Sequence, residues 1–251
     1  MYFFAPIRTT QACLILVTVV TIFSSNWNSP VLAQSEFEFK ASDHVCIIGN
    51  TLADRMQHYP WLETYLTLAN PDKKISFRNL GFAADEIKTR PRSANFGSPD
   101  QWLAKCNATV IFCFFGYNEA LRGESGLPQF ESDLADSIDQ MLAQKYNNQI
   151  APRLAFFSPI AHENLNSPHL PDGSANNANL RRYTDSMRRI CEEKDIPFYD
   201  LFTITEQLYK TSDVPLTMNG IHLNDHGNKE LARALMPILS PSSPVPSDDA
   251  V

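Results

Sequence analysis

Several well-known catalytic and binding motifs are missing from the 251-residue sequence. It has no GxSxG nucleophile elbow, no phosphate-binding P-loop and no CxxC pair. His162 and Glu163 do not form the HExxH zinc motif, because residue 166 is asparagine. The four cysteines after residue 33 include no pair at metal-ligand spacing. These absences argue against the classes of enzyme and binding protein that such motifs mark. We predict no metal site and no cofactor.

Positive charge is scarce as well. The chain has 21 Lys and Arg residues against 28 Asp and Glu residues, and its net charge is −7. Such an acidic surface argues against a nucleic-acid partner. No internal repeat is visible, and 251 residues of which 43% are hydrophobic are ordinary for one globular α/β domain. Nothing in the sequence specifies an oligomeric state.

The apolar run near the N-terminus, residues 12–23, is too short for a membrane span, which needs roughly 20 residues. Arg8 precedes the run, and small or aliphatic residues at 31–33 follow it, a pattern typical of a secretory signal peptide cleaved after Ala33. We therefore predict a signal peptide over residues 1–33, a secreted or periplasmic protein, and no membrane span after cleavage. Loss of Arg8 would change the net charge from −7 to −8.

Four cysteines follow the signal peptide: Cys46, Cys106, Cys113 and Cys191. Cys46 and Cys113 lie in apolar runs, where cysteine packs as a small hydrophobic residue, so buried free thiols are the favoured interpretation. A disulfide between these two is the alternative in a secreted protein, because neighbouring strands would bring their sulfurs close together.

Apolar runs alternate with stretches of helical periodicity along the chain. Strands are predicted over 45–49, 75–81, 109–116, 153–160 and 197–201, and helices over 52–66 with a break at Pro60, 130–142, 179–194 and 225–239. This alternation predicts a three-layer α/β/α sandwich with a parallel sheet of about five strands. The domain is placed at 43–239, after a polar leader at 34–42 and before a disordered tail at 240–251.

Four short stretches follow the predicted strands or precede the last helix: residues 49–52, 79–85, 116–119 and 219–223. The carboxyl ends of parallel strands meet at one edge of a sheet, where ligands gather. In order and separation, these stretches resemble the four blocks of the SGNH, or GDSL-like, hydrolase family, and the resemblance covers nearly the whole mature chain. It implies a flavodoxin-like α/β/α fold and the hydrolysis of a small-molecule or glycan ester.

The resemblance also assigns roles to particular residues. Thr51 takes the place of the serine nucleophile, and His222 is the base. The backbone N–H groups of Thr51 and Ala84 and the Asn118 amide form the oxyanion hole, with Ala84 where the family has Gly. Asn219 orients His222, where the family has Asp. The resemblance therefore implies a Thr-His centre in which three of the family's residues are substituted.

Each substitution has a physical consequence. The extra methyl of Thr51 fixes its side-chain rotamer and crowds the attacking oxygen. Ala84 still has a backbone N–H, and it serves as well as Gly provided that its φ is not positive. The Asn219 amide either accepts from Nδ1–H of His222, or donates and leaves the proton on the wrong nitrogen. Replacing Asp by Asn in a serine-protease triad costs roughly 10⁴-fold in rate.

Polar residues beside these positions are candidate substrate contacts: Asn50, Glu119, His162 and Glu163. The alternatives are structural: a helix N-cap for Thr51, a turn for Asn118 and solvated loop positions for the others. The pair Asn219-Gly220 is prone to deamidation, which would restore an Asp, but a simple turn is favoured. Two functions follow from the resemblance, an ester hydrolase and an inactive relative that binds a glycan or acylated ligand.

Overall fold

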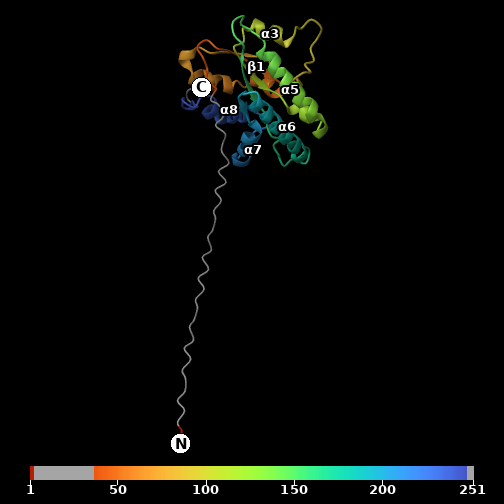
Figure 1. Cartoon of the computed structure of the whole chain (residues 1–251), viewed down its shortest axis with the longest axis vertical. Coiled ribbons are helices and arrows are strands. Elements are labelled where there is room, and N and C mark those ends of the chain that lie inside the picture. Colours follow the sequence, from red (N-terminus) through yellow and green to blue (C-terminus); the bar gives the residue numbers. More distant parts are fainter. Residues whose placement is uncertain (3–36, 248–251) are drawn as a thin grey trace. The chain divides into compact units, whose positions relative to one another are not determined.

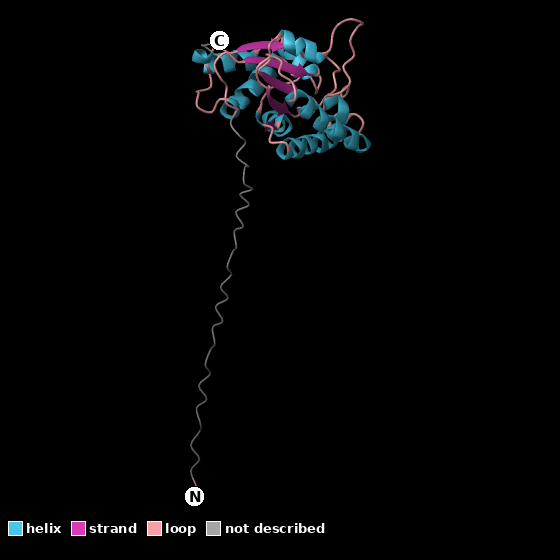
Figure 2. Cartoon of the chain, turned by 45° about the horizontal axis from the view of Figure 1, so that its top comes forward, coloured by secondary structure: helices cyan, strands magenta, loops and turns pink. Residues whose placement is uncertain are grey.

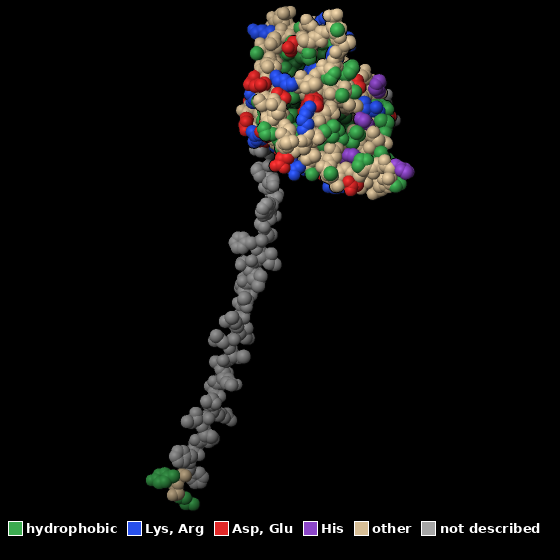
Figure 3. All heavy atoms as spheres, turned by 90° about the vertical axis from the view of Figure 1, so that its right-hand side faces the viewer, with side chains coloured by type: hydrophobic (Ala, Val, Ile, Leu, Met, Phe, Trp, Pro, Cys, Tyr) green, Lys and Arg blue, Asp and Glu red, His purple; other side chains and the backbone are tan. Residues whose placement is uncertain are grey.

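The computed structural model of the chain describes residues 1–2 and 37–247. Apart from its first two residues, the predicted signal peptide lies outside the described part, so its cleavage and the secretion of the protein stay predictions. Within the described part, no helix is both long and apolar enough to cross a membrane. On the face drawn in Figure 3, acidic and basic side chains are interspersed.

The sheet has five parallel strands in the order β2-β1-β3-β4-β5 (Figure 2). The strands are β1 (His44–Gly49), β2 (Ser76–Asn79), β3 (Val110–Phe114), β4 (Arg153–Phe157) and β5 (Phe198–Tyr199). β1 and β3 are almost entirely buried, as expected for central strands covered by helices on both faces. The predicted parallel sheet and its α/β fold are confirmed.

Helices cover both faces of the sheet (Figure 1). The α-helices of the described part are α1 (Thr51–Met56), α2 (Trp61–Ala69), α3 (Pro99–Lys105), α4 (Tyr117–Ala120), α5 (Leu127–Leu142), α6 (Ser174–Glu193), α7 (Leu201–Thr211) and α8 (Asp225–Leu239). The alternating side chains of β1 divide the core in two, because Val45 and Ile47 pack with α1, α2 and α8. Cys46 and Ile48 pack on the other face with α3, α5 and α6. The result is the predicted three-layer sandwich.

Three helices were not predicted: α3, α7 and the single-turn α4. α3 is short, but its start carries a recognisable signal, a capping box between Ser98 and Gln101 with Pro99 at the first helical position. α7 begins after Asp200, whose side chain accepts a hydrogen bond from the Thr203 N–H, another standard N-cap.

The ends of the domain contribute more to the fold than the sequence suggested. Phe37 and Phe39 of the predicted polar leader are buried, and both rings make edge contacts with Phe112 of β3. Ser240 and Ser243 of the predicted disordered tail hydrogen-bond to Asn70 and to the Ala69 carbonyl at the end of α2. The domain therefore extends beyond the predicted boundaries of 43 and 239 on both sides.

The four described cysteines are free thiols, as favoured from the sequence. Cys46, Cys113 and Cys191 are buried, and burial raises the pKa of each thiol, to about 12 for Cys191. A raised pKa keeps the thiol protonated and unreactive, so these cysteines act as core residues.

Candidate active site

The exit from β1 places Thr51 at the start of α1. Gly49 has a φ of +147°, and a Cβ on it would lie 2.2 Å from the Phe114 carbonyl oxygen, so a side chain is excluded there. Asn50 caps α1 by accepting a hydrogen bond from the Leu52 N–H at 3.1 Å. The Thr51 N–H itself makes no hydrogen bond to another described residue. It is a free donor just after the end of β1.

Ala84 lies in the loop that follows β2. The loop is anchored at its start, where Asn79 accepts from the Gly81 N–H at 2.8 Å and donates to the Ala53 carbonyl at 2.7 Å. Ala84 has a φ of +66°, which costs a non-glycine residue roughly 1–2 kcal/mol. Ala was expected to replace Gly freely only if φ at this position is not positive. Because φ is positive, that condition is not met. Among the described residues, nothing accepts a hydrogen bond from the Ala84 N–H.

Asn118 lies on α4, directly after β3. Its Nδ2 donates to the Asp85 carbonyl at 3.1 Å, which uses one of the two amide hydrogens and leaves the second. The bond also joins α4 to the loop that carries Ala84. The predicted turn role and the predicted oxyanion role are thus compatible in one side chain.

Glu119, predicted as a substrate contact, is turned into the protein. It is 3% exposed, and its carboxylate accepts from the backbone N–H groups of Ile87 at 2.9 Å and Gly116 at 3.0 Å. Burial raises the pKa of this carboxyl group, and the backbone donors oppose that effect. Because both oxygens are already hydrogen-bonded, the structure gives Glu119 a role in holding the loop and corrects the prediction.

The hydrogen bonds around Asn219 fix the orientation of its amide. Its Oδ1 accepts from the backbone N–H groups of Ile221 at 3.3 Å and His222 at 3.1 Å. The amide nitrogen therefore faces Nδ1 of His222, at 3.1 Å, because a flipped amide would set its NH₂ against two backbone donors. Nδ1 is then an acceptor, and the imidazole proton lies on Nε2. The sequence left two alternatives for this amide, to accept from Nδ1–H or to donate to Nδ1. The network assigns the second, which leaves the proton of His222 on Nε2. A nucleophile needs Nε2 free to accept its proton.

The cation Arg55 lies close enough to His222 to influence its charge state. Burial lowers the pKa of His222, and the guanidinium of Arg55 lowers it further. Arg55 stacks over Tyr59 at 5.6 Å and lies 3.7 Å from the Met218 sulfur, but it forms no ion pair with a described residue. His222 is accordingly neutral at physiological pH.

A pocket of about 240 Å³ brings four of the predicted residues together, whereas Ala84 and Asn219 do not line it. Its lining includes Asn50, Thr51, Asn118 and His222, while Asn219 contacts the far nitrogen of the His222 ring. The described part contains no direct hydrogen bond between the Thr51 hydroxyl and His222, a separation that is common in active sites without substrate. The lining residues that were not predicted are Leu52, Phe114, Phe115, Tyr117, Leu121, Ser158, Pro159, Ile160 and Ile221.

His162 and Glu163, predicted as substrate contacts, support the segment that carries His222. Neither lines the pocket. His162 is 7% exposed, and a Cβ on Gly173 or Gly220 would collide with its ring. Glu163 is 6% exposed, and its carboxylate hydrogen-bonds to the segment that leads to Asn219. Glu163 therefore has structural contacts in place of the predicted ones, whereas His162 lines a separate pocket with Asn176, so its predicted substrate contact stays a prediction.

The Asn219-Gly220 pair is held as a turn. Deamidation requires the Gly220 nitrogen to attack the Asn219 side chain, but this N–H donates to the Thr217 hydroxyl at 2.9 Å. The hydrogen bond opposes that attack and agrees with the favoured interpretation. In the described part, no group of three His, Cys, Asp or Glu side chains is arranged to hold a metal ion.

A sequence model of the GDSL-like lipase/acylhydrolase family matches residues 50–230. Apart from Gly49, the match includes all four predicted blocks, and it covers well over half of the chain. The chain belongs to this family. Membership in the GDSL-like family supports a hydrolase in general terms. The search of curated proteins found no match to this sequence.

Several solved structures share the fold. A putative GDSL-like lipase from Parabacteroides merdae superposes with a TM-score of 0.63 at 13% identity, over 81% of this chain and 98% of its own. A catalytic mutant of Axe2, an acetylxylan esterase from Geobacillus stearothermophilus, gives 0.61 at 14% identity, over 78% and 94%. A gut microbial diltiazem-metabolizing enzyme gives 0.61 at 18% identity over 82% of this chain, which spans only 48% of that enzyme.

Proposed function

We propose that this protein is a secreted ester hydrolase that acts on short acyl esters of carbohydrates through Thr51 and His222. The observation that carries the proposal is that all three predicted oxyanion donors have a hydrogen available, two of them on residues that line the pocket of Thr51. The N–H groups of Thr51 and Ala84 are free, and the Asn118 amide has one unused hydrogen. Preorganised donors of this kind stabilise the charge that develops on an ester carbonyl during acyl transfer.

In the proposed reaction, Oγ1 of Thr51 attacks the ester carbonyl carbon, and its proton passes to Nε2 of His222. The alcohol leaves with that proton, and the acyl group remains on Thr51. Water then attacks the acyl carbon, gives its proton to His222, and releases the acid while the Thr51 hydroxyl is restored.

The Asn219 amide slows this reaction. Before Nε2 can accept a proton, the amide has to rotate and the imidazole proton has to move to Nδ1. Rotation breaks the hydrogen bonds from the Ile221 and His222 backbone, each worth about 1 kcal/mol. A neutral amide also leaves the imidazolium uncompensated, so we expect turnover that is measurable but slow.

The proposed substrate class rests on the size of the pocket and on one structural neighbour. A volume of about 240 Å³ suits an acetyl-sized acyl group better than a long fatty-acyl chain. The Geobacillus neighbour is named as an acetylxylan esterase. An O-acetylated oligosaccharide is therefore the first substrate to test.

Replacement of Thr51 by Ala should reduce hydrolysis of p-nitrophenyl acetate and acetylated xylo-oligosaccharides by at least about 100-fold, because it removes the nucleophile. Thr67→Ala, on the exposed side of α2, is the matched control and should keep the wild-type rate. Intact-protein mass spectrometry of the wild type with the p-nitrophenyl ester should detect an acyl group on Thr51. Equal rates in the wild type and in Thr51→Ala would refute the proposal.

The pH dependence of kcat/KM should report the lowered pKa of His222. The imidazole accepts a proton only in its neutral form, so activity should fall on the acid side with a midpoint below pH 6.5. Arg55→Gln removes a nearby cation and should move this midpoint upward. Arg78→Gln, an exposed arginine on β2, is the control. A wild-type midpoint above 6.5 would contradict this assignment.

The orientation of Asn219 favours a second candidate function, an inactive relative that binds a glycan or acylated ligand. With its proton on Nε2, His222 is a hydrogen-bond donor to the pocket, suited to holding a carbonyl or hydroxyl oxygen. Calorimetric titration with acetylated xylo-oligosaccharides separates the two functions, because binding without any turnover by the wild type supports the second.

A further inference from the structure

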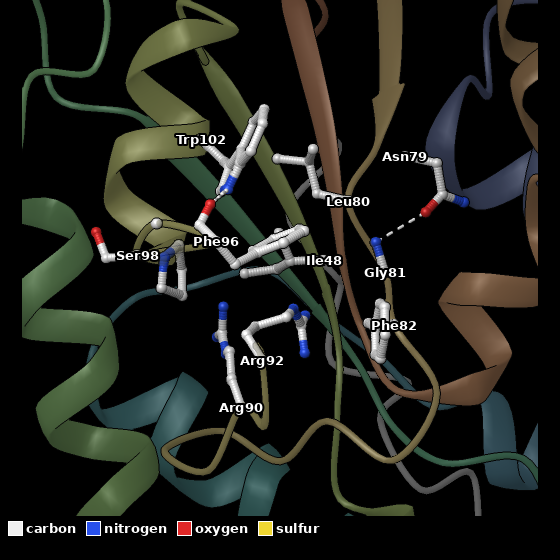
Figure 4. A pocket seen from close by; sticks show the side chains of 12 residues that line it. Ile48, Asn79, Leu80, Gly81, Phe82, Arg90, Arg92, Phe96, Ser98 and Trp102 are labelled. Atoms are coloured by element: carbon white, nitrogen blue, oxygen red, sulfur yellow. Dashed lines mark hydrogen bonds between the residues drawn. The ribbon is translucent and has the colours of Figure 1, made fainter. Parts of the chain in front are cut away.

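A second cavity, of about 410 Å³, lies beside β1 and β2 and shares no lining residue with the pocket of Thr51. Figure 4 shows it between the ends of these strands, α3 and the loop that carries two arginines. It is lined by Ile48, Asn79, Leu80, Gly81, Phe82, Arg90, Arg92, Phe96, Gly97, Ser98, Pro99 and Trp102. Its volume is in the range of small-molecule sites.

The two arginines of this cavity differ in their partners. Arg92 forms a bidentate pair with Asp85, at 2.6 and 2.7 Å, and its guanidinium lies over the Phe82 ring. Arg90 makes no hydrogen bond or ion pair with a described residue, and its guanidinium lies 5.0 Å from the Phe115 ring. In Figure 4 both side chains extend into the cavity. The guanidinium N–H groups of Arg90 are therefore available to hydrogen-bond to a ligand.

The carboxylates near Arg90 are already engaged. Both oxygens of Asp85 bind Arg92, and Asp100 accepts a hydrogen bond from the Tyr146 hydroxyl at 2.5 Å. Burial lowers the pKa of Arg90, and the charges of Asp85 and Asp100 raise it, but a guanidinium stays protonated in either case. A half-buried charge without a hydrogen-bonded anion is costly, so an anionic ligand would be stabilised here.

The other polar groups of the cavity have partners within the protein. The Asn79 side chain binds the Gly81 N–H and the Ala53 carbonyl. The Trp102 indole donates to the Phe96 carbonyl at 3.0 Å, and the Ser98 hydroxyl accepts from its own helix. Few groups are left to bind the hydroxyls of a sugar, whereas the apolar lining suits an apolar ring.

We propose that this cavity binds a carboxylate attached to an aromatic ring, with Arg90 holding the carboxylate in a bidentate pair. The ring of the ligand packs among the side chains of Phe82, Phe96 and Trp102, of which Phe82 is 46% and Phe96 44% exposed. Such pairs are planar and charge-assisted, which makes them selective for carboxylates over neutral groups. The proposal does not depend on the hydrolase reaction.

Calorimetric titration of the full chain with benzoate, cinnamate, and the neutral analogues benzamide and cinnamamide tests the proposal. Both acids should bind, and the amides should bind at least about tenfold more weakly. Arg90→Gln should weaken acid binding by about 10- to 100-fold and bring it to the level of the amides. Arg182→Gln, an exposed arginine of α6, should bind the acids like the wild type.

Three further measurements separate loss of binding from loss of folding and from effects of the other pocket. Thermal unfolding of Arg90→Gln shows whether the variant is folded, and Arg90→Lys, which keeps the charge but loses the fork, should bind with intermediate affinity. His222→Ala should bind the acids like the wild type, because His222 lines the other pocket. The proposal is overturned if the acids fail to bind the wild type, if folded Arg90→Gln binds them equally well, or if glucuronate binds and benzoate does not.

Discussion

Replacement of Asn219 by Asp should raise kcat/KM for p-nitrophenyl acetate by roughly 10³- to 10⁴-fold, the reverse of the loss seen when an Asp of a serine-protease triad becomes Asn. The carboxylate has no N–H to donate. It would accept from Nδ1 of His222 and from the backbone N–H groups that the Asn219 oxygen now binds. Nε2 would then be free to take the proton of Thr51.

The same replacement should change the charge state of His222. The new anion stabilises the imidazolium, so the pKa of His222 should rise and the acid limb of the rate profile should move to higher pH. ¹⁵N NMR of the imidazole provides a direct measurement, with the proton expected on Nε2 in the wild type and on Nδ1 in Asn219→Asp.

Two control variants isolate the effect. Asn219→Ala removes the amide without supplying a charge and should gain little, and Asn219→Asp with His222→Ala should lose the gain completely. If Asn219→Asp leaves the rate unchanged while NMR shows the proton on Nδ1, then proton transfer is not what limits the reaction. The added methyl of Thr51 would be the remaining obstacle, tested by Thr51→Ser in the same background.

Much of the fold could be predicted because its main elements are encoded locally. β1 and β3 are continuous apolar runs, and α8 was predicted with the same bounds, 225–239, that the structure shows. The predicted break of the first helix at Pro60 lies between α1 and α2. The burial of Phe37 was not predictable in this way, since it depends on contact with Phe112, distant in sequence.

For the candidate site, prediction from the sequence was more limited than for the fold. The position of a residue after a strand could be read from the sequence, which placed Thr51, Asn118 and His222 around one pocket. The direction of a side chain could not. Glu119 follows its strand as closely as Asn118 does, yet it turns inward because two backbone N–H groups of the folded loop are there to bind it. The orientation of the Asn219 amide likewise depends on backbone geometry that the sequence does not reveal.

Replacement of Glu163 by Ala should lower the free energy of unfolding by about 4 kcal/mol, a large share of the 5–15 kcal/mol typical of a domain. The buried carboxylate accepts three hydrogen bonds, from the Leu216 N–H at 3.1 Å, the Thr217 N–H at 2.7 Å and the Thr217 hydroxyl at 2.6 Å. Ala would leave these donors without an acceptor. Urea unfolding measures the loss, with Glu192→Ala on the surface of α6 as the control.

Glu163→Gln distinguishes this structural role from substrate binding. Gln keeps one oxygen for the Thr217 groups but sets an NH₂ against the Leu216 N–H, so a loss of about 2 kcal/mol is expected. Because Thr217 also holds the Gly220 N–H, the displacement would reach the segment of Asn219 and His222, and kcat should fall while KM changes little. A variant with wild-type stability and a raised KM would instead place Glu163 against the substrate.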